Sequence, residues 1–324
     1  MRPATCENNL YCSHNKLWRE MCDIFYDAEL LSNMSVAHVV SMPTIAEILQ
    51  ITQSQLHNSD SPRLDAELLL AQVMNKPRSW LYTWPERVLT SDEQREFTSL
   101  IARRAAGVPV AYLTGRCGFW SLDLKVTTAT LIPRPDTETM IAWALELIPI
   151  DAHWRIADLG TGSGAIALAL AHERPSCCFT ATDISSAALV VAEENARANK
   201  IVNVSFRQGI WFEPLAGARH ELIVSNPPYV AEGDSHLANL RHEPVSALAA
   251  GADGLADLRL LIEKAPGSLQ ENGWLLLEHG WEQGAAVRDL LQQYGYHHIQ
   301  TCRDPAGLER ISGGRAPNTV PLQK

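Results

Sequence analysis

The sequence predicts an α/β protein: a doubly wound parallel sheet preceded by a small N-terminal helical domain. Two observations predict this fold class. From about residue 155 onward, short apolar runs typical of buried strands alternate with stretches of helical periodicity. Before about residue 106, the apolar spacing is helical throughout. Strands and helices that alternate along a chain favour a parallel sheet with helices on both faces.

Composition narrows the class of protein. The 324 residues are 46% hydrophobic and 20% charged, which is enough for two domains with full cores. The formal net charge of -10 disfavours direct nucleic-acid binding, because the molecule as a whole repels phosphate. The seven cysteines form no CxxC pair and no zinc-like spacing, which indicates reduced thiols and no metal. No run approaches the apolar length of a membrane span, so we expect a cytoplasmic protein. We also expect a monomer.

Four segments are expected along the chain. Residues 1–42 are interrupted by charges and predict an extension without ordered structure. Residues 43–113 predict the helical domain, with Thr44 as an N-cap and one apolar helix face that carries Leu64, Leu68, Leu69 and Val73. Residues 114–135, rich in glycine and proline, predict a hairpin linker, and residues 136–324 the sheet domain.

The elements of the sheet domain follow in order. Predicted strands are 155–159, 178–182, 202–206, 222–225 and 274–277, and predicted helices are 165–173, 187–199, 255–269 and 285–294. Ligands in such a sheet bind beyond the carboxyl ends of the strands. The residues directly after each strand are therefore the candidates for a functional site.

A glycine-rich turn follows the first of these strands. It runs Asp158-Leu159-Gly160-Thr161-Gly162-Ser163-Gly164, and its glycines let the backbone approach a ligand closely. Asp183, after the second strand, can accept hydrogen bonds from two ribose hydroxyls. Both features also fit the GxGxxG/A pattern of nicotinamide or flavin enzymes, or a tight turn without ligand, so they do not identify the cofactor.

The most specific feature is Asn226-Pro227-Pro228-Tyr229, directly after the fourth strand. Proline restricts its own backbone and that of the residue before it, which holds Asn226 and Pro227 rigidly open. The Asn226 side-chain oxygen and the Pro227 carbonyl can accept both hydrogens of one planar NH2 group, while Tyr229 stacks on its plane. This arrangement predicts methylation of an amide or an aromatic amine, by orientation and electrostatics rather than by a general base.

These motifs, together with Leu131-Ile132-Pro133-Arg134-Pro135-Asp136-Thr137-Glu138 and Leu277-Glu278-His279-Gly280, resemble the release-factor glutamine methyltransferases, the PrmC or HemK family. The resemblance covers residues 43 to about 315. It implies a seven-stranded Rossmann-like methyltransferase sheet whose last strands, near 297–302 and 310–312, form an antiparallel hairpin. It also implies a substrate-binding role for the helical domain, S-adenosylmethionine as methyl donor with S-adenosylhomocysteine as product, and the Gly-Gly-Gln glutamine of peptide chain release factors as acceptor.

The resemblance also implies roles for individual residues. The catalytic residues would be Asn226, Pro227 and Tyr229. The cofactor would contact Gly160, Thr161, Gly162, Ser163, Gly164, Asp183, Trp211 and Asn226. The substrate would contact Asn226, Pro227, Pro228, Tyr229, Phe119, Arg134 and Glu138. Gly209-Ile210 replace the acidic residue common before the aromatic at Trp211, and the loop 303–310 is altered from the usual form.

Several functional readings stay open on the sequence alone. A related branch of the family methylates a glutamine of a large-subunit ribosomal protein, and adenine methyltransferases acting on nucleic acid use the same Asn-Pro-Pro-Tyr chemistry. A dehydrogenase and a non-catalytic binding module are weaker alternatives. His279, next to Glu278, is interpreted as a residue that orders a loop rather than as a base.

Overall fold

The computed structural model describes residues 42–215, 217–238 and 240–317. Apart from Met42, the predicted N-terminal extension lies outside the described residues. After it come the helices α2 (Ile45–Gln55), α3 (Pro62–Met74), α4 (Arg78–Thr83), α5 (Ser91–Ala105) and α6 (Val110–Thr114), joined by short connections. Thr44 caps α2 as predicted: its hydroxyl accepts from the Glu47 N–H at 3.3 Å, and the Glu47 carboxylate accepts from the Thr44 N–H at 2.8 Å.

The predicted apolar face of α3 is correct for Leu69 and Val73 and wrong for Leu64 and Leu68. Leu64 and Leu68 are 39% and 37% exposed, whereas Leu69, Leu70 and Ala66 are fully buried. The run from Leu68 to Ala71 is apolar on all sides of the helix, so periodicity alone does not determine which face is buried. Packing of α3 against α2 and α5 selects the buried face.

A short antiparallel hairpin follows, with strands β1 (Arg116–Phe119) and β2 (Leu122–Lys125). Its apolar side chains Phe119, Leu122 and Leu124 join the same core as Met140 of helix α7 (Glu138–Leu147). The 3-10 turn η2 (Pro135–Thr137) directly precedes α7. The segment that carries the Pro-Arg-Pro-Asp-Thr-Glu run is thereby connected to the sheet domain.

The main sheet has seven strands in the order β5-β4-β3-β6-β7-β9-β8. They are β3 (Arg155–Leu159), β4 (Cys178–Asp183), β5 (Val204–Gln208), β6 (His220–Ser225), β7 (Leu269–Glu278), β8 (His297–Arg303) and β9 (Glu309–Arg315). β3 to β7 are parallel to one another, and β9 runs antiparallel between β7 and β8. The predicted Rossmann-like sheet with its antiparallel C-terminal hairpin is confirmed.

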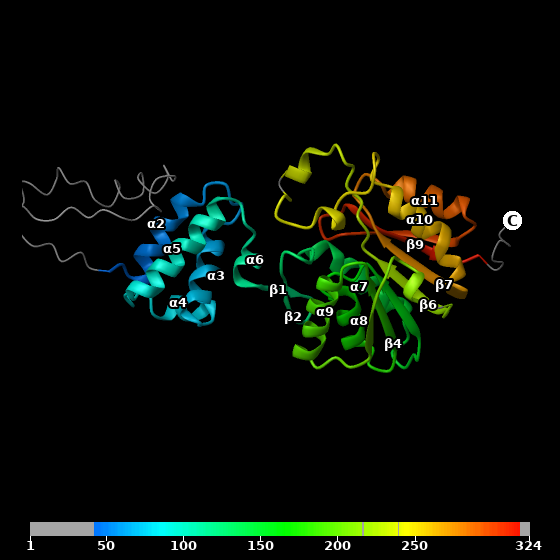
Figure 1. Cartoon of the computed structure of the whole chain (residues 1–324), viewed down its shortest axis with the longest axis horizontal. Helices are drawn as coiled ribbons and strands as arrows, with labels where there is room; N and C mark the ends of the chain where they lie inside the picture. Colours follow the sequence, from blue (N-terminus) through cyan, green and yellow to red (C-terminus); the bar gives the residue numbers. More distant parts are fainter. Residues whose placement is uncertain (1–41, 216, 239, 318–324) are drawn as a thin grey trace, which may run out of the picture. The chain divides into compact units, whose positions relative to one another are not determined.

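Helices cover both faces of this sheet (Figure 1). On one face lie α7, α8 (Ala165–Glu173) and α9 (Ser186–Ala198), and on the other lie α10 (Ala256–Lys264) and α11 (Gly284–Gln293). The alternation along β6 explains this: Leu222 and Val224 enter the first core, and Ile223 enters the second. All three side chains are fully buried, as expected for a central parallel strand.

The order of the strands in the sheet indicates where a ligand binds. After β3, the next strands extend the sheet toward β5, whereas β6 and β7 extend it the other way. The strand order therefore reverses between β3 and β6, and ligands in such sheets bind at this point, beyond the carboxyl ends. The glycine-rich turn follows β3, and Asn226 follows β6.

Several predicted boundaries differ from the structure. β5 begins two residues later than predicted, and Val202 is 93% exposed. α10 ends at Lys264 rather than at residue 269, because Pro266 has no N–H for a helical hydrogen bond. β7 is longer than predicted and begins at Leu269. The other 3-10 turns are η3 (Glu213–Leu215), η4 (Ser235–Ala238), η5 (Val245–Ala247) and η6 (Ala265–Gly267).

Candidate active site

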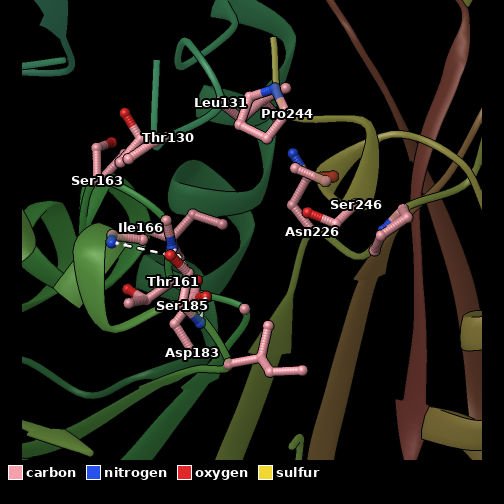
Figure 2. Close-up of a pocket in the computed structure, with 18 of the residues that line it drawn as sticks. Thr130, Leu131, Thr161, Ser163, Ile166, Asp183, Ser185, Asn226, Pro244 and Ser246 are labelled. Carbon is pink, nitrogen blue, oxygen red and sulfur yellow. Dashed lines mark hydrogen bonds between the residues drawn. The ribbon is translucent and has the colours of Figure 1, made fainter. Parts of the chain in front are cut away.

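A cavity of about 460 Å³ lies at the carboxyl ends of β3, β4 and β6. This volume is in the range of small-molecule sites. Figure 2 shows Asp183 and Ser185 on one side of it and Asn226, near Ser246, on another. Of the residues predicted from the sequence, those that line the cavity are Gly160, Thr161, Gly162, Ser163, Asp183, Trp211, Asn226 and Pro228.

The glycine-rich turn adopts a backbone that side chains disfavour. Gly160, Gly162 and Gly164 have φ of 73°, 56° and 84°, in the left-handed region. A Cβ on Gly160 would lie 3.3 Å from the ring of Trp211, and one on Gly164 would lie 3.0 Å from Leu168 and 3.2 Å from the Cβ of Ala192. Gly160 and Gly164 therefore serve close approach as well as backbone conformation, and Gly162 serves backbone conformation alone.

Asp158 stabilises the glycine-rich turn through two hydrogen bonds. Its Oδ2 accepts from the Thr161 hydroxyl at 2.6 Å and from the Ala167 N–H at 3.2 Å, while Oδ1 has no partner among the described residues. Burial raises the pKa of Asp158 to about 7, although the two hydrogen bonds lower it. The side chain is 1% exposed and does not line the cavity.

Asp183 connects the ends of β3 and β4. Its Oδ2 accepts from the Gly162 N–H and its Oδ1 from the Ser185 N–H, both at 2.8 Å. A carboxylate offers about four lone-pair positions, so two remain for a ligand. The residue therefore shapes the glycine-rich turn and still presents acceptors to the cavity.

Asn195 of α9 is a structural determinant of the site that the sequence reasoning missed. It is 1% exposed, and its Nδ2 donates to the carbonyl of Ser163 at 2.9 Å. It also accepts from the N–H of Lys125 at 2.6 Å and donates to the Lys125 carbonyl at 2.9 Å. The available signal was an asparagine in a helix interior, a position where asparagine competes with the backbone for hydrogen bonds.

Trp211 follows β5 and borders the cavity with a φ of 47°. The Thr182 hydroxyl donates to its carbonyl at 3.3 Å. Gly209 and Ile210 replace the acidic residue that is common at this point in the family. A Cβ on Gly209 would lie 2.5 Å from Pro214, so no side chain fits there. The N–H of Gly209 donates to the Asp183 carbonyl at 3.0 Å, and that of Ile210 to the Glu213 carboxylate at 3.3 Å.

The Asn226-Pro227-Pro228-Tyr229 segment continues from the end of β6. Ser225 anchors that end, because its hydroxyl donates to the Leu159 carbonyl at 2.7 Å. Asn226 is half-buried, lines the cavity, and donates from Nδ2 to the hydroxyl of Thr137 at 3.5 Å. Gln283 Nε2 donates to the Tyr229 carbonyl at 3.0 Å. The segment is thus held at both ends.

Tyr229 packs against the core rather than lining the cavity. Its hydroxyl donates to Oε1 of Glu278 at 3.2 Å, and its ring packs against the core that α10 and α11 share with the sheet. Neither Tyr229 nor Pro227 lines the cavity, although both were predicted to contact the substrate. The predicted stacking role of Tyr229 has no support in this geometry.

Glu278, at the end of β7, is 1% exposed, and its Oε2 has no partner among the described residues. Burial raises its pKa to about 7, although hydrogen bonds from Thr137 and Tyr229 lower it. Nearby, Arg310 bridges Asp136 and Asp304 at 3.1 Å each. The altered loop 303–310 therefore anchors the segment that contains Thr137.

Three residues predicted to line the substrate pocket have other surroundings. Phe119 is 2% exposed and belongs to the hydrophobic core, because the β1–β2 register pairs it with buried Leu122. Arg134 forms an ion pair with Glu243 at 2.6 Å, and Glu138 accepts from the Trp120 N–H at 2.7 Å. None of the three lines the cavity.

His279 is fully buried, and its two ring nitrogens lie 2.8 Å from the Gly280 carbonyl and 2.8 Å from the Ser312 hydroxyl. Burial lowers its pKa. These contacts match the predicted role in ordering a loop.

No helix within the described ranges is long and apolar enough to span a membrane.

The charges around the cavity are of one sign. Among the described residues that line it, Asp183 and Asp257 carry the charge, and there is no lysine, arginine or histidine. Such a lining fits a positively charged ligand. It is unsuited to the phosphates of a dinucleotide, which bring negative charge of their own.

Comparisons with known proteins agree with this fold. The family description "PrmC N-terminal domain" matches residues 47–115, and "Methyltransferase small domain" matches residues 141–294. Among solved structures, the hMettl16 catalytic domain has a TM-score of 0.50 at 16% identity, covering 69% of this chain and 84% of that one. At this identity, the likeness concerns the fold alone.

Curated relatives are much closer in sequence. A release factor glutamine methyltransferase of Pseudomonas aeruginosa is 51% identical over 276 residues, which is 85% of this chain and 99% of the relative. A protein of the same name from Escherichia coli is 47% identical over 264 residues, 81% of this chain and 95% of the relative. With this identity over most of both lengths, the chain belongs to the release factor glutamine methyltransferase family.

Proposed function

We propose that this chain methylates the side-chain amide nitrogen of the glutamine in the Gly-Gly-Gln motif of peptide chain release factors, with S-adenosylmethionine as methyl donor. The observation that carries the proposal is the orientation of Asn226 at the cavity wall. Its Nδ2 points to Thr137, so its Oδ1 is the end that remains for an acceptor NH2 group. The names of the close relatives support the same acceptor.

The cavity chemistry supports S-adenosylmethionine. Asp183 retains two lone-pair positions beyond its bonds to Gly162 and Ser185, which suit the two hydroxyls of a ribose. The backbone of Gly160–Gly164 allows close approach of the methionine part, and Trp211 offers an aromatic wall for the adenine. The charged residues of the lining, Asp183 and Asp257, are both acidic, which suits a sulfonium and an ammonium group.

Bound S-adenosylmethionine would supply an electrophilic methyl group on a positively charged sulfur, and the sulfur would keep the bonding electron pair as the methyl moves to nitrogen. An amide nitrogen is a weak nucleophile, because its lone pair is delocalised into the carbonyl. Asn226 Oδ1 counters this by accepting one N–H and fixing the direction of the nitrogen. The nitrogen then loses one proton, so the product is a neutral methylamide.

A methyl-transfer assay tests the acceptor. Purified protein is incubated with methyl-labelled S-adenosylmethionine and, in parallel, with a release factor, the same factor with Gln→Ala in Gly-Gly-Gln, a large-subunit ribosomal protein and duplex DNA. We expect label on the unsubstituted release factor alone. Label on the Gln→Ala factor, or stronger label on the ribosomal protein or DNA, contradicts the proposal.

A single variant tests the site. Asn226→Ala should lower kcat about 100-fold or more, as expected when a preorganised polar group at the reacting centre is removed. The affinity for S-adenosylhomocysteine, measured by calorimetry, should stay within about tenfold, since Asp183 and the glycine-rich turn are unchanged. A normal kcat for this variant would mean that Asn226 does not hold the acceptor.

A further inference from the structure

One carboxylate of the cavity lining has no partner among the described residues. Asp257, in the first turn of α10, lines the cavity and is half-buried. Its carboxyl forms no hydrogen bond or ion pair with any residue that the structure describes, and burial raises its pKa. Asp183, in contrast, already accepts from two backbone N–H groups. Because a partly buried carboxylate without a partner is unfavourable, the position of Asp257 suits a ligand that donates a hydrogen bond to it.

Helix α10, which carries Asp257, packs on the same side of the sheet as Trp211. Leu258, the next residue of α10, is fully buried in the core that α10 and α11 share with the sheet. Trp211 packs against that same core and also lines the cavity. The glycine-rich turn leads instead into α8, which covers the opposite face. Asp257 therefore belongs to the end of the cavity where Trp211 offers its aromatic wall.

Backbone acceptors beside Trp211 are already engaged. The carbonyl of Ile210 accepts from the Glu213 N–H at 3.0 Å. The carbonyl of Trp211 accepts from the Thr182 hydroxyl at 3.3 Å. The carboxylate of Asp257 has no such competing donor, so it is available to a polar group of the ligand.

We propose that Asp257 accepts a hydrogen bond from the exocyclic amine of the adenine of S-adenosylmethionine and thereby selects adenine over other purines. The assignment rests on the proposed function, in which the adenine lies against Trp211. The adenine amine acts as a donor, because its lone pair is delocalised into the ring, and an ionised carboxylate only accepts. Hypoxanthine has a carbonyl oxygen in place of the amine, so it would set an acceptor against the carboxylate.

Titration calorimetry with two ligands tests this pairing. S-adenosylhomocysteine carries adenine, and S-inosylhomocysteine carries hypoxanthine in its place but is otherwise the same. We expect the unsubstituted protein to bind S-adenosylhomocysteine at least about 10-fold more tightly, the effect of one hydrogen bond to a charged group. Asp257→Ala should weaken S-adenosylhomocysteine binding about 10-fold without weakening S-inosylhomocysteine binding, so that the preference for adenine is lost.

Asp257→Asn tests the contact with the base more directly, because an amide can turn its NH2 end toward the carbonyl oxygen of hypoxanthine. This variant should bind S-inosylhomocysteine about fivefold more tightly than the unsubstituted protein does. Asp289→Asn, at an exposed position of α11 outside the cavity, is the control and should leave both affinities within about twofold. Thermal unfolding midpoints check that the variants fold.

Equal weakening of both ligands in Asp257→Ala overturns the inference, because that loss would come from removed charge or altered packing rather than from contact with the base. Unchanged binding of S-adenosylhomocysteine in Asp257→Ala overturns it as well. If the unsubstituted protein binds S-adenosylhomocysteine and the variants keep its preference for adenine, the inference fails and the proposed function stands. If the unsubstituted protein binds neither ligand, the proposed function itself fails.

Discussion

Asn195 Nδ2 donates to the carbonyl of Ser163 at 2.9 Å, and this bond ties the middle of α9 to the glycine-rich turn. The same side chain exchanges two hydrogen bonds with the backbone of Lys125 in β2. One buried amide therefore connects the hairpin, the helix and the cofactor side of the cavity.

Asn195→Ala should lower the free energy of unfolding by about 2–4 kcal/mol, because it leaves the buried carbonyl of Ser163 and the backbone N–H and carbonyl of Lys125 without these partners. Urea unfolding measures this. Arg197→Ala is the control: its side chain, on the same helix, is 71% exposed, and its loss should change stability by less than about 0.5 kcal/mol. Equal effects of the two substitutions would contradict the role of Asn195.

Two alanine variants of the glycine-rich turn form a second matched pair for stability measurements. Gly162→Ala meets no atom within 4 Å and should cost about 1–2 kcal/mol, the strain of a left-handed backbone. Gly164→Ala has the same strain and also approaches Leu168 and Ala192, so it should cost at least about 1 kcal/mol more. Urea unfolding without cofactor compares the two. The packing argument fails if Gly162→Ala is the more destabilised variant.

Asp183→Asn should weaken the binding of S-adenosylhomocysteine about 10- to 100-fold. An amide cannot accept from both Gly162 and Ser185, since one end is now a donor, and it also loses charge-assisted bonds. Titration calorimetry gives the dissociation constant. Asp151→Asn, at an exposed position outside the cavity, is the control and should bind normally. Unchanged affinity in Asp183→Asn would remove this residue from the cofactor site.

Stability should depend on pH through Asp158. Burial raises its folded-state pKa to about 7, well above the ordinary value of 3.8. Between these values the folded protein holds a proton that the unfolded chain has released, so the free energy of unfolding falls as pH rises from about 4 to about 7. Asp158→Asn should flatten this part of the curve, measured by urea unfolding at several pH values. Glu278, with a pKa of about 7, contributes in the same direction and remains in the variant. A slope unchanged by Asp158→Asn would contradict the assignment.

Much of the fold was predictable because hydrophobic periodicity is a local signal. The bounds of β3 and α8 match the predictions, and Pro266 shows why the predicted end of α10 was too late. The face of α3 was not predictable, because Leu68 and Leu69 are equally apolar and only the neighbouring helices distinguish them.

The candidate site, like the fold, was predictable from the sequence only in part. Gly160 and Asn226 directly follow β3 and β6, and Asp183 is the last residue of β4, so their convergence on one cavity could be expected from the topology. Phe119 could not be placed, because an aromatic side chain suits a pocket and a core equally well, and the hairpin register sends it to the core.

The sequence by itself determined the order of strands and helices, the glycines of the turn and the polar residues at the strand ends, since these depend on neighbours along the chain. Only the tertiary structure decided which buried side chains support that site. Asn226 and Thr137 are 89 residues apart, and Tyr229 and Glu278 are 49 apart. A hydrogen bond requires contact within about 3.5 Å, and such contacts between distant segments exist only once the sheet and its connections have formed.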